Sequence, residues 1–332
     1  MQGYDTGIEG PSLMTFKISI RLAVLSLVAL SALGMSGLIA LSIYTNDLRD
    51  RNQAALERVT AVETTLAEVE NKFLRARRAE KDFLLRKDEK YVERHAGIST
   101  DLAVLLDTLE GEVASIDGVE GATEQVQQIA TEIAGYADAF DQLVEARRML
   151  GLDETLGLEG SLRAAVREAE GSLETLDRPE MQVKMLMMRR HEKDFIMRED
   201  TKYLDRLNAR VEEFMSFPAS WYETPEQRAE IQGLMTAYQT AFAAFVAKTL
   251  EHNEITAKLS ERFAEAEPHL ESLARAFGDY ADGFKAETAA AEAAAERMAI
   301  MGGAGGIVAF ILVAVVLAQR IAAPLGRIGT AL

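Results

Sequence analysis

The chain has 332 residues, and its 53 acidic and 36 basic side chains give a formal net charge of −17. So acidic a protein repels the phosphate backbone, which excludes nucleic acid as an expected partner. The absence of cysteine excludes disulfides and thiolate metal sites, and because the four histidines are scattered we expect no metal and no cofactor.

Two long uncharged runs stand out along the chain. The first, at 22–44, reads LAVLSLVALSALGMSGLIALSIY, and the second, at 298–318, reads MAIMGGAGGIVAFILVAVVLA. Each is long enough, as a helix, to cross the ~30 Å hydrocarbon core of a bilayer. A cleaved signal peptide is the alternative for the first run, but its apolar region would be only about 7 to 15 residues long. We therefore predict two transmembrane helices.

Basic residues at the outer ends of the two runs indicate their orientation. Lys17 and Arg21 precede the first run, and Arg320 and Arg327 follow the second. Positive residues are retained on the cytoplasmic side, so both termini are predicted to lie in the cytoplasm. Residues 1–21 form the N-terminal cytoplasmic segment in this prediction. The segment between the runs, at 45–297, then lies outside it.

The first half of the external segment predicts long helices. Ala, Leu, Glu, Lys and Arg recur at helical spacing, which predicts an all-α fold. Nothing breaks a helix from Asn46 to about Leu109, a length of about 95 Å. That is too long for one ordinary bundle and predicts two stacked four-helix bundles. A turn at 116–121 is followed by a helix to about Leu150, with Thr123 as its N-cap.

The second half begins with a glycine-rich loop at 151–160. We expect a short helix at 161–176 and a longer one at 181–215. The final helix is predicted to begin at Pro225, with Thr224 as its N-cap, and to run into the second apolar segment.

The chain contains an internal duplication. Residues 77–94 (RRAEKDFLLRKDEKYVER) and 189–206 (RRHEKDFIMREDTKYLDR) are identical at eleven of eighteen positions. An aromatic pair four residues apart follows each copy: Tyr136 with Phe140, and Tyr238 with Phe242. The repeat predicts a helical hairpin used twice. We expect the two hairpins to form one antiparallel bundle, with both motif helices pointing away from the membrane.

The repeated charges have three possible roles. They are weak surface ion pairs, direct ligand contacts, or members of a partly buried polar network at the junction of the two bundles. Because identical charges are retained in both copies while neighbouring residues differ, we favour the network. The residues assigned to it are Glu80, Asp82, Arg86, Glu192, Asp194 and Arg198.

No pattern of residues points to catalysis. The sequence has no nucleophile beside a base, no HExxH pair and no glycine loop of the kind that cradles phosphate. We therefore assign no catalytic residue and do not expect the chain to be an enzyme.

The motif pair resembles bacterial chemoreceptors, the methyl-accepting chemotaxis proteins, that carry a helical bimodular sensor domain. The resemblance rests on Glu80-Lys81-Asp82-Phe83 with Arg86, Asp88 and Tyr91, on their second copy, and on GLEGSLRAAV at 157–166. After the second apolar run, RIAAPL at 320–325 resembles the start of a HAMP signal-relay helix, which would occupy 319–332.

This resemblance implies a homodimeric receptor in the inner membrane, with its ligand-binding domain at 45–297 in the periplasm. It also implies small carboxylate ligands, such as acetate or tricarboxylic-acid-cycle intermediates, and cytoplasmic chemotaxis proteins as signalling partners. By the resemblance, the carboxylate is held by Arg51, Arg58, Arg163 and Arg167, with Arg167 standing where the family often has His. Arginine suits this task because its planar fork binds a carboxylate through two parallel hydrogen bonds.

Two other functions remain open at this point. In the first, the chain is the sensor part of a histidine kinase or of another HAMP-linked signalling enzyme. Alternatively, the chain is a membrane-anchored helical scaffold that binds a protein partner and responds to no small molecule.

Overall fold

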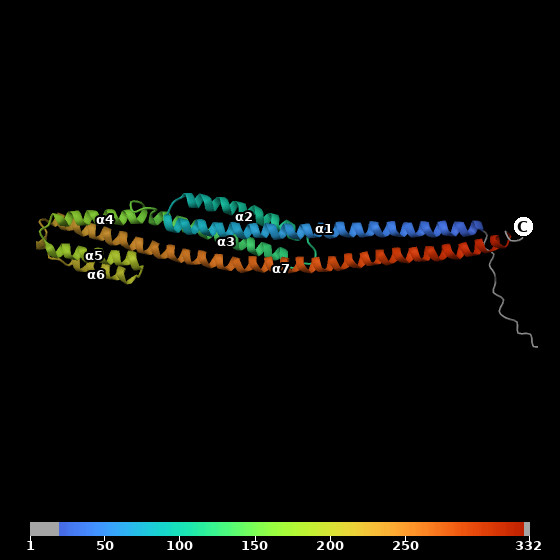
Figure 1. The fold of residues 1–332 in the computed structure, drawn as a ribbon. Helices are drawn as coiled ribbons and strands as arrows, with labels where there is room; N and C mark the ends of the chain where they lie inside the picture. Colours follow the sequence, from blue (N-terminus) through green and yellow to red (C-terminus); the bar gives the residue numbers. More distant parts are fainter. Residues whose placement is uncertain (1–19, 329–332) are drawn as a thin grey trace, which may run out of the picture. The chain divides into compact units, whose positions relative to one another are not determined.

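The computed structural model describes residues 20–328, and the regular secondary structure in this part of the chain is all helical, as predicted. The helices, shown in Figure 1, are α1 (Ile20–Arg86), α2 (Lys90–Ala114), α3 (Ala122–Leu150), α4 (Gly157–Glu174), α5 (Pro179–Arg198), α6 (Lys202–Met215), the 3-10 helix η1 (Ala219–Trp221) and α7 (Pro225–Ile328). Lys17, the side chains of Arg320 and Arg327, and the end of the expected relay segment lie outside the described residues.

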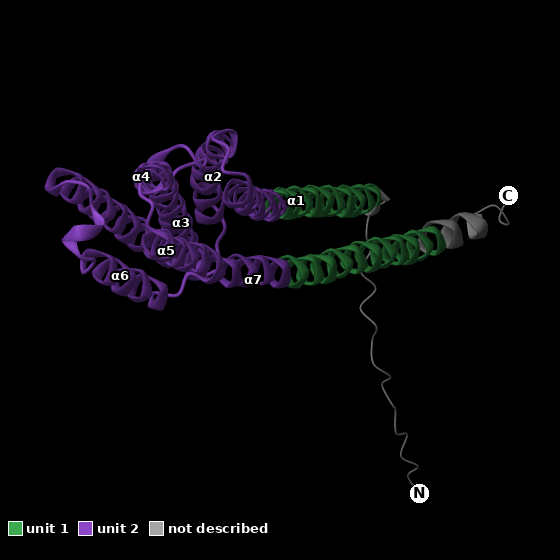
Figure 2. Ribbon diagram, turned by 90° about the vertical axis from the view of Figure 1, so that its left-hand side faces the viewer, with its two compact units in different colours: residues 1–57, 281–332 green, residues 58–280 purple. Residues whose placement is uncertain are grey.

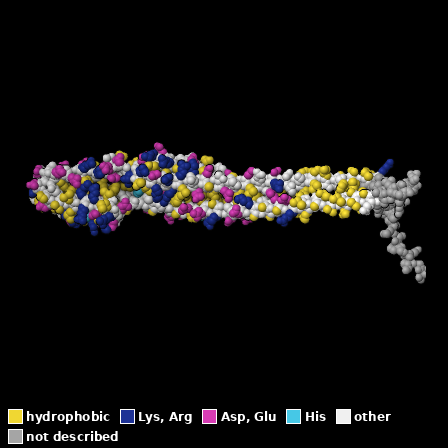
Figure 3. Space-filling view, viewed as in Figure 1, with side chains coloured by type: hydrophobic (Ala, Val, Ile, Leu, Met, Phe, Trp, Pro, Cys, Tyr) yellow, Lys and Arg dark blue, Asp and Glu magenta, His cyan; other side chains and the backbone are white. Residues whose placement is uncertain are grey.

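The chain divides into two compact units, coloured separately in Figure 2. The first unit consists of residues 1–57 and 281–332, and it contains the apolar segments of α1 and α7. The apolar side chains of these segments are exposed, and they form the yellow band in Figure 3. By length and composition, both helices are able to cross a membrane.

Within the first unit, the apolar segments of α1 and α7 contact each other. A Cβ atom added to Gly303 would lie 3.8 Å from Cδ2 of Leu38, which is an ordinary packing distance. Farther along the same pair of helices, Arg49 Nε lies 3.8 Å from Glu292 Oε2. An alanine side chain would therefore fit at Gly303 without a clash, and the two helices lie side by side here.

The second unit, residues 58–280, contains two hydrophobic clusters. The first cluster receives side chains from α1, α2, α3 and the part of α7 from Leu259 to Phe277. The second cluster receives them from α4, α5, α6 and the part of α7 from Ile231 to Val246. Helix α7 therefore contributes to both clusters.

Helical spacing of apolar residues explains how each helix joins its cluster. In α2 the buried residues recur at intervals of three and four: Tyr91, His95, Ile98, Leu102, Leu106, Leu109 and Val113. This spacing places them on one face of the helix. Burial of each large apolar side chain contributes about 1.5 to 3 kcal/mol, so such a stripe is enough to fix the face that turns inward.

The long helices predicted through the two motif copies are each interrupted. Helix α1 ends at Arg86 and α5 ends at Arg198, so the expected continuous helices at 46–109 and 181–215 are wrong. Each copy of the motif forms a tight corner between two helices. We expected a hairpin motif, but we placed its turn elsewhere because no glycine or proline marks the corner.

The grouping of the helices also differs from the prediction. The two motif copies belong to different clusters, and each copy packs with the aromatic pair that follows it. Tyr136 and Phe140 join the first cluster, while Tyr238 and Phe242 join the second. The prediction that both copies share one bundle is therefore wrong.

The glycine-rich loop after α3 is confirmed, and its glycines are needed where the backbone passes close to itself. Gly151 and Gly157 have φ angles of +118° and +60°, which favour glycine. A Cβ atom at Gly160 would lie 2.2 Å from the carbonyl oxygen of Thr155. Helix α4 therefore begins at Gly157, slightly earlier than the expected start at Ser161.

The predicted helix starts had different outcomes. Thr224 caps α7, because its Oγ1 accepts a hydrogen bond of 3.1 Å from the backbone N–H of Gln227. Thr123 does not cap α3, which begins at Ala122 after Gly121 in a left-handed conformation.

Candidate functional site

The duplicated motif forms the same corner twice. Lys87 and Glu199 occupy equivalent positions, with φ angles of 55° and 54°. The backbone N–H of Lys87 donates to the carbonyl of Phe83, and that of Glu199 donates to the carbonyl of Phe195, each over 2.7 Å. A left-handed backbone conformation is costly for a residue other than glycine, so packing by the surrounding residues must stabilise each corner.

An aspartate that is identical in the two motif copies stabilises the start of the helix after each corner. Asp88 accepts a hydrogen bond of 3.0 Å from the backbone N–H of Lys90, and Asp200 accepts an equal one from Lys202. These bonds satisfy donors at the start of α2 and α6, as N-caps do. The identical aspartates are thus explained by the corner itself.

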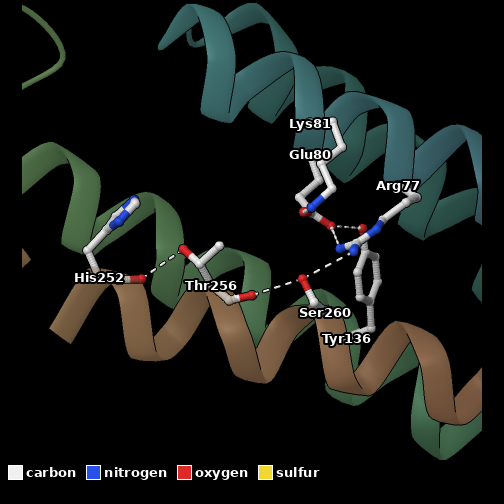
Figure 4. Close-up of polar contacts among 7 residues, drawn as sticks. All are labelled: Arg77, Glu80, Lys81, Tyr136, His252, Thr256 and Ser260. Carbon is white, nitrogen blue, oxygen red and sulfur yellow. Dashed lines mark hydrogen bonds and ion pairs between the residues drawn. The ribbon is translucent and has the colours of Figure 1, made fainter. Parts of the chain in front are cut away.

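A buried polar network lies next to the first corner, on the side of α1 (Figure 4). Glu80 is fully buried, and its Oε2 accepts hydrogen bonds from Arg77 Nη1 at 2.5 Å and from the Tyr136 hydroxyl at 2.8 Å. Arg77 Nη2 also donates to Ser260 Oγ at 3.1 Å. Lys81 Nζ lies 3.0 Å from the other carboxylate oxygen, without hydrogen-bond geometry. The network joins α1, α3 and α7.

Aromatic side chains surround this network. Phe73 stacks on Phe263 with ring centroids 4.6 Å apart, and the guanidinium of Arg77 lies 4.9 Å from the centre of the Phe263 ring. Burial, followed by the negative charge of Glu80, raises the pKa of Tyr136 well above its ordinary value. The hydroxyl of Tyr136 therefore stays protonated and remains a hydrogen-bond donor.

His95 lies against the same aromatic group. Its ring stacks on Phe140 with centroids 3.9 Å apart and is 2% exposed. Burial lowers the pKa of His95 to about 4, although Glu80 acts in the opposite direction. The imidazole is therefore neutral near neutral pH.

The second copy builds an equivalent network. Glu192 is buried and accepts a hydrogen bond of 2.7 Å from the Tyr238 hydroxyl and one of 2.5 Å from Arg189 Nη1. The additional partner of the arginine differs between the two networks. Arg189 Nε lies 3.3 Å from Glu170 Oε1 on α4, whereas Arg77 donates to Ser260 on α7. This network joins α5, α7 and α4.

The residues of the predicted polar network therefore separate into two groups. Glu80 and Glu192 are buried and hydrogen-bonded, but each bonds a tyrosine of its own cluster, whereas one network between the two bundles was predicted. Asp82 and Arg86 are 3.6 Å apart, and the Arg86 side chain is 59% exposed. The equivalent pair in α5, Asp194 and Arg198, is 4.0 Å apart and similarly exposed. These two pairs are surface ion pairs, so their expected burial is wrong.

The structural duplication is longer than the motif. Lys72 pairs with Asp101, and Lys184 pairs with Glu213. Each member of the second pair lies 112 residues after its counterpart, which is also the spacing of the motif copies. Sequence reasoning missed these pairs because Asp101 and Glu213 differ in type and lie outside the stretch of high identity.

Two of the four arginines assigned to a carboxylate ligand lie on α1. Arg51, in the first unit, is 2.7 Å from Asp47 and is 76% exposed. Arg58, in the second unit, is exposed and lies about 42 Å before Arg86 along the helix axis. Neither is buried in a pocket.

The other two arginines lie on α4 in the second cluster. Arg163 Nη1 is 2.9 Å from Glu154 Oε1, and the Arg163 side chain is 37% exposed. Arg167 lines an open groove of about 500 Å³ between α4 and α7, together with Gln227 and Glu230. Helix α4 begins close enough to the first corner for the charge of Glu159 to act on Lys87. The structure therefore brings Arg163 and Arg167 together but does not join Arg58 to them.

The networks are suited to holding helices together and carry no sign of catalysis. Each consists of a carboxylate, an arginine and a protonated tyrosine, and neither contains a nucleophile next to a base. Across residues 20–328, no group of three His, Asp or Glu side chains is arranged to hold a metal ion. The chemistry available is the formation and breaking of hydrogen bonds between helices.

Comparison of the chain with models of protein families, with curated proteins and with solved structures finds no match. The resemblance to chemoreceptors therefore rests on the motif residues.

Proposed function

We propose that the chain is the sensory part of a two-pass membrane receptor that binds small organic acids outside the cytoplasm. In this proposal the apolar segments of α1 and α7 are the two membrane spans, and the two clusters are stacked four-helix modules of a periplasmic sensor. The receptor is a homodimer in the inner membrane, and its output passes through a HAMP segment to chemotaxis proteins.

The observation that carries this proposal is the continuity of α7. This helix extends from Pro225 to Ile328, so one continuous helix contains residues of both clusters and the second apolar segment. It also takes part in both polar networks, through Ser260 in the first and Tyr238 in the second. A ligand that moved α7 against either cluster would therefore displace the segment that reaches the membrane.

The networks supply a physical basis for two states. Packed interiors rearrange between discrete arrangements instead of deforming continuously. Hydrogen bonds to a buried carboxylate are lost when the donor helix moves by a turn or rotates. A ligand with different affinities for the two arrangements shifts their populations, which is the requirement for signalling.

The test is a binding screen of the full chain in lipid nanodiscs. Thermal unfolding is followed with acetate, succinate, malate and citrate, one at a time, at fixed pH and ionic strength. A ligand at 100 times its dissociation constant is expected to stabilise the chain by about 2.7 kcal/mol. Chloride at equal ionic strength serves as the control.

The same screen separates this proposal from a membrane-anchored scaffold. A scaffold that binds only protein partners responds to none of the acids. Stabilisation by chloride equal to that by the acids would also contradict a carboxylate sensor, because it would reflect screening of charge.

A further inference from the structure

The second corner of the duplicated motif contacts the middle of α7. Asn253 Nδ2 donates a hydrogen bond of 2.6 Å to Glu199 Oε2 of the second corner. At the neighbouring residue, burial lowers the pKa of His252, with further lowering by the positive charges of Arg147 and Lys87. Arg147 at the end of α3 and Lys87 at the first corner are thus close enough for their charges to act on His252.

Arg147, near the end of α3, has two guanidinium nitrogens at this junction that donate no hydrogen bond within residues 20–328, and together they form one edge of the guanidinium. Its side chain is only 15% exposed, and its Nε and Nη2 atoms are buried. Among the described residues, no protein group accepts a hydrogen bond from either atom. The nearest carboxylate oxygen, Oε2 of Glu159, lies 3.9 Å from Nη2, which is too far for a hydrogen bond.

The adjacent arginine shows how such an edge is normally satisfied. Arg148 Nε donates to one carboxylate oxygen of Glu89 at 2.9 Å, and Arg148 Nη2 donates to the other at 2.7 Å. This is the two-pronged geometry in which a guanidinium binds a carboxylate. The same two nitrogens of Arg147 point into the protein without a partner, although buried donors are almost always satisfied.

Other groups at the junction suit the same ligand. His252 Nε2 is buried and has no protein hydrogen-bond partner. Lys87 is partly buried at the first corner, where burial and then the charge of Arg147 lower its pKa. Glu159 and Glu199 are the acidic groups facing these residues, and Glu199 is already hydrogen-bonded to Asn253.

We propose that this junction binds a small carboxylate, held by Nε and Nη2 of Arg147. With the anion bound the His252 imidazole is protonated, so Nδ1 keeps its 3.5 Å contact with Asn253 Oδ1 and Nε2 donates a further hydrogen bond to the ligand. Lys87 supplies another positive charge. The proposal rests on the proposed sensing of organic acids and assigns it a site different from the predicted arginines of α4. An anion here would contact the end of α3, the first corner and the middle of α7, the helix that contributes to both clusters.

The test measures binding of acetate, succinate, malate, citrate and inorganic phosphate to the full chain in nanodiscs by calorimetry. Arg147→Lys keeps the charge but removes the two-pronged edge, so we expect carboxylate affinity to fall about 10-fold to 100-fold. Arg148→Lys is the matched control and should change affinity less than twofold. His252→Leu is a second variant that removes the other donor, and it should also weaken binding.

Each outcome gives a decision, provided that circular dichroism shows the variants to be folded. If Arg147→Lys and His252→Leu bind the acid as the wild type does, the junction site is refuted while acid sensing stands. Loss of binding in Arg163→Ala but not in Arg147→Lys would move the site to α4. Binding of phosphate but of no acid would overturn the carboxylate assignment, and binding of neither would overturn the sensor function as well.

Glu159 provides the last control, because its carboxylate is the natural competitor for Arg147. If a ligand uses the Arg147 edge, Glu159→Gln should leave binding intact or strengthen it. If Glu159 itself closes onto Arg147 as a structural ion pair, Glu159→Gln and Arg147→Lys should instead both lower the unfolding midpoint of the ligand-free chain, with no change in anion affinity. That result would refute the junction site.

Discussion

The hydroxyl of Tyr136 offers a direct measure of the buried network. Tyr136→Phe removes one donor to the buried carboxylate of Glu80 and leaves the ring in place between its neighbours. A hydrogen bond to a charged group contributes about 1.5 to 3 kcal/mol, and Arg77 still pairs with Glu80 in the variant. We therefore expect the free energy of unfolding to fall by about 2 kcal/mol.

The assay is urea unfolding of the full chain in detergent, followed by far-ultraviolet circular dichroism. Asp82→Ala is the matched control, because it breaks an exposed ion pair of the same motif and should cost about 0.5 kcal/mol or less. Glu80→Ala should cost more than Tyr136→Phe, about 3 to 5 kcal/mol, because it leaves Arg77 without its partner. If Tyr136→Phe costs no more than Asp82→Ala, the network does not stabilise the fold and the reasoning is refuted.

Two further predictions concern single residues. The folded pKa of His95, about 4, lies below its ordinary value of 6.5, so its contribution to stability is complete above pH 6.5 and is lost as the pH falls toward 4. His95→Leu, which copies Leu207 of the second repeat, should therefore flatten the pH dependence of the unfolding free energy in that window; an unchanged slope would contradict the burial of His95. Gly160→Ala forces a Cβ against the Thr155 carbonyl and should lower the free energy of unfolding by about 1 to 3 kcal/mol. Gly171, on the same helix, has open space around it, so Gly171→Ala should raise the free energy of unfolding by up to about 1 kcal/mol. Equal effects of the two substitutions in thermal unfolding would show that the loop relaxes.

Most residues that are identical in the two motif copies have the same structural role in both copies. Asp88 restarts a helix, Glu80 binds a tyrosine of a neighbouring helix, and Tyr91 packs beside the corner with 6% of its surface exposed. The same roles recur in the second copy. Position 87 is one of the seven positions of the motif that differ between the copies, and its counterpart Glu199 accepts a hydrogen bond from Asn253 of α7.

The sequence alone determined the local features. Apolar residues at helical spacing predict helices whatever the rest of the chain does, because one face must be buried. The uncharged runs, the duplication, the glycine-rich loop and the cap at Thr224 are likewise properties of neighbouring residues. Each depends on interactions within a few positions, which a sequence displays directly.

Only the tertiary structure decided how these parts combine. The corner at Lys87 has no glycine or proline, so its left-handed backbone is stabilised by packing that the local sequence does not show. Tyr136, which donates a hydrogen bond to Glu80, lies 56 residues farther along the chain. The two side chains meet only because the chain reverses direction twice between them and the helices pack in one alignment. In the same way, Arg147 and His252 lie on helices far apart in sequence. Their meeting depends on the packing of the whole unit, which no single stretch of residues specifies.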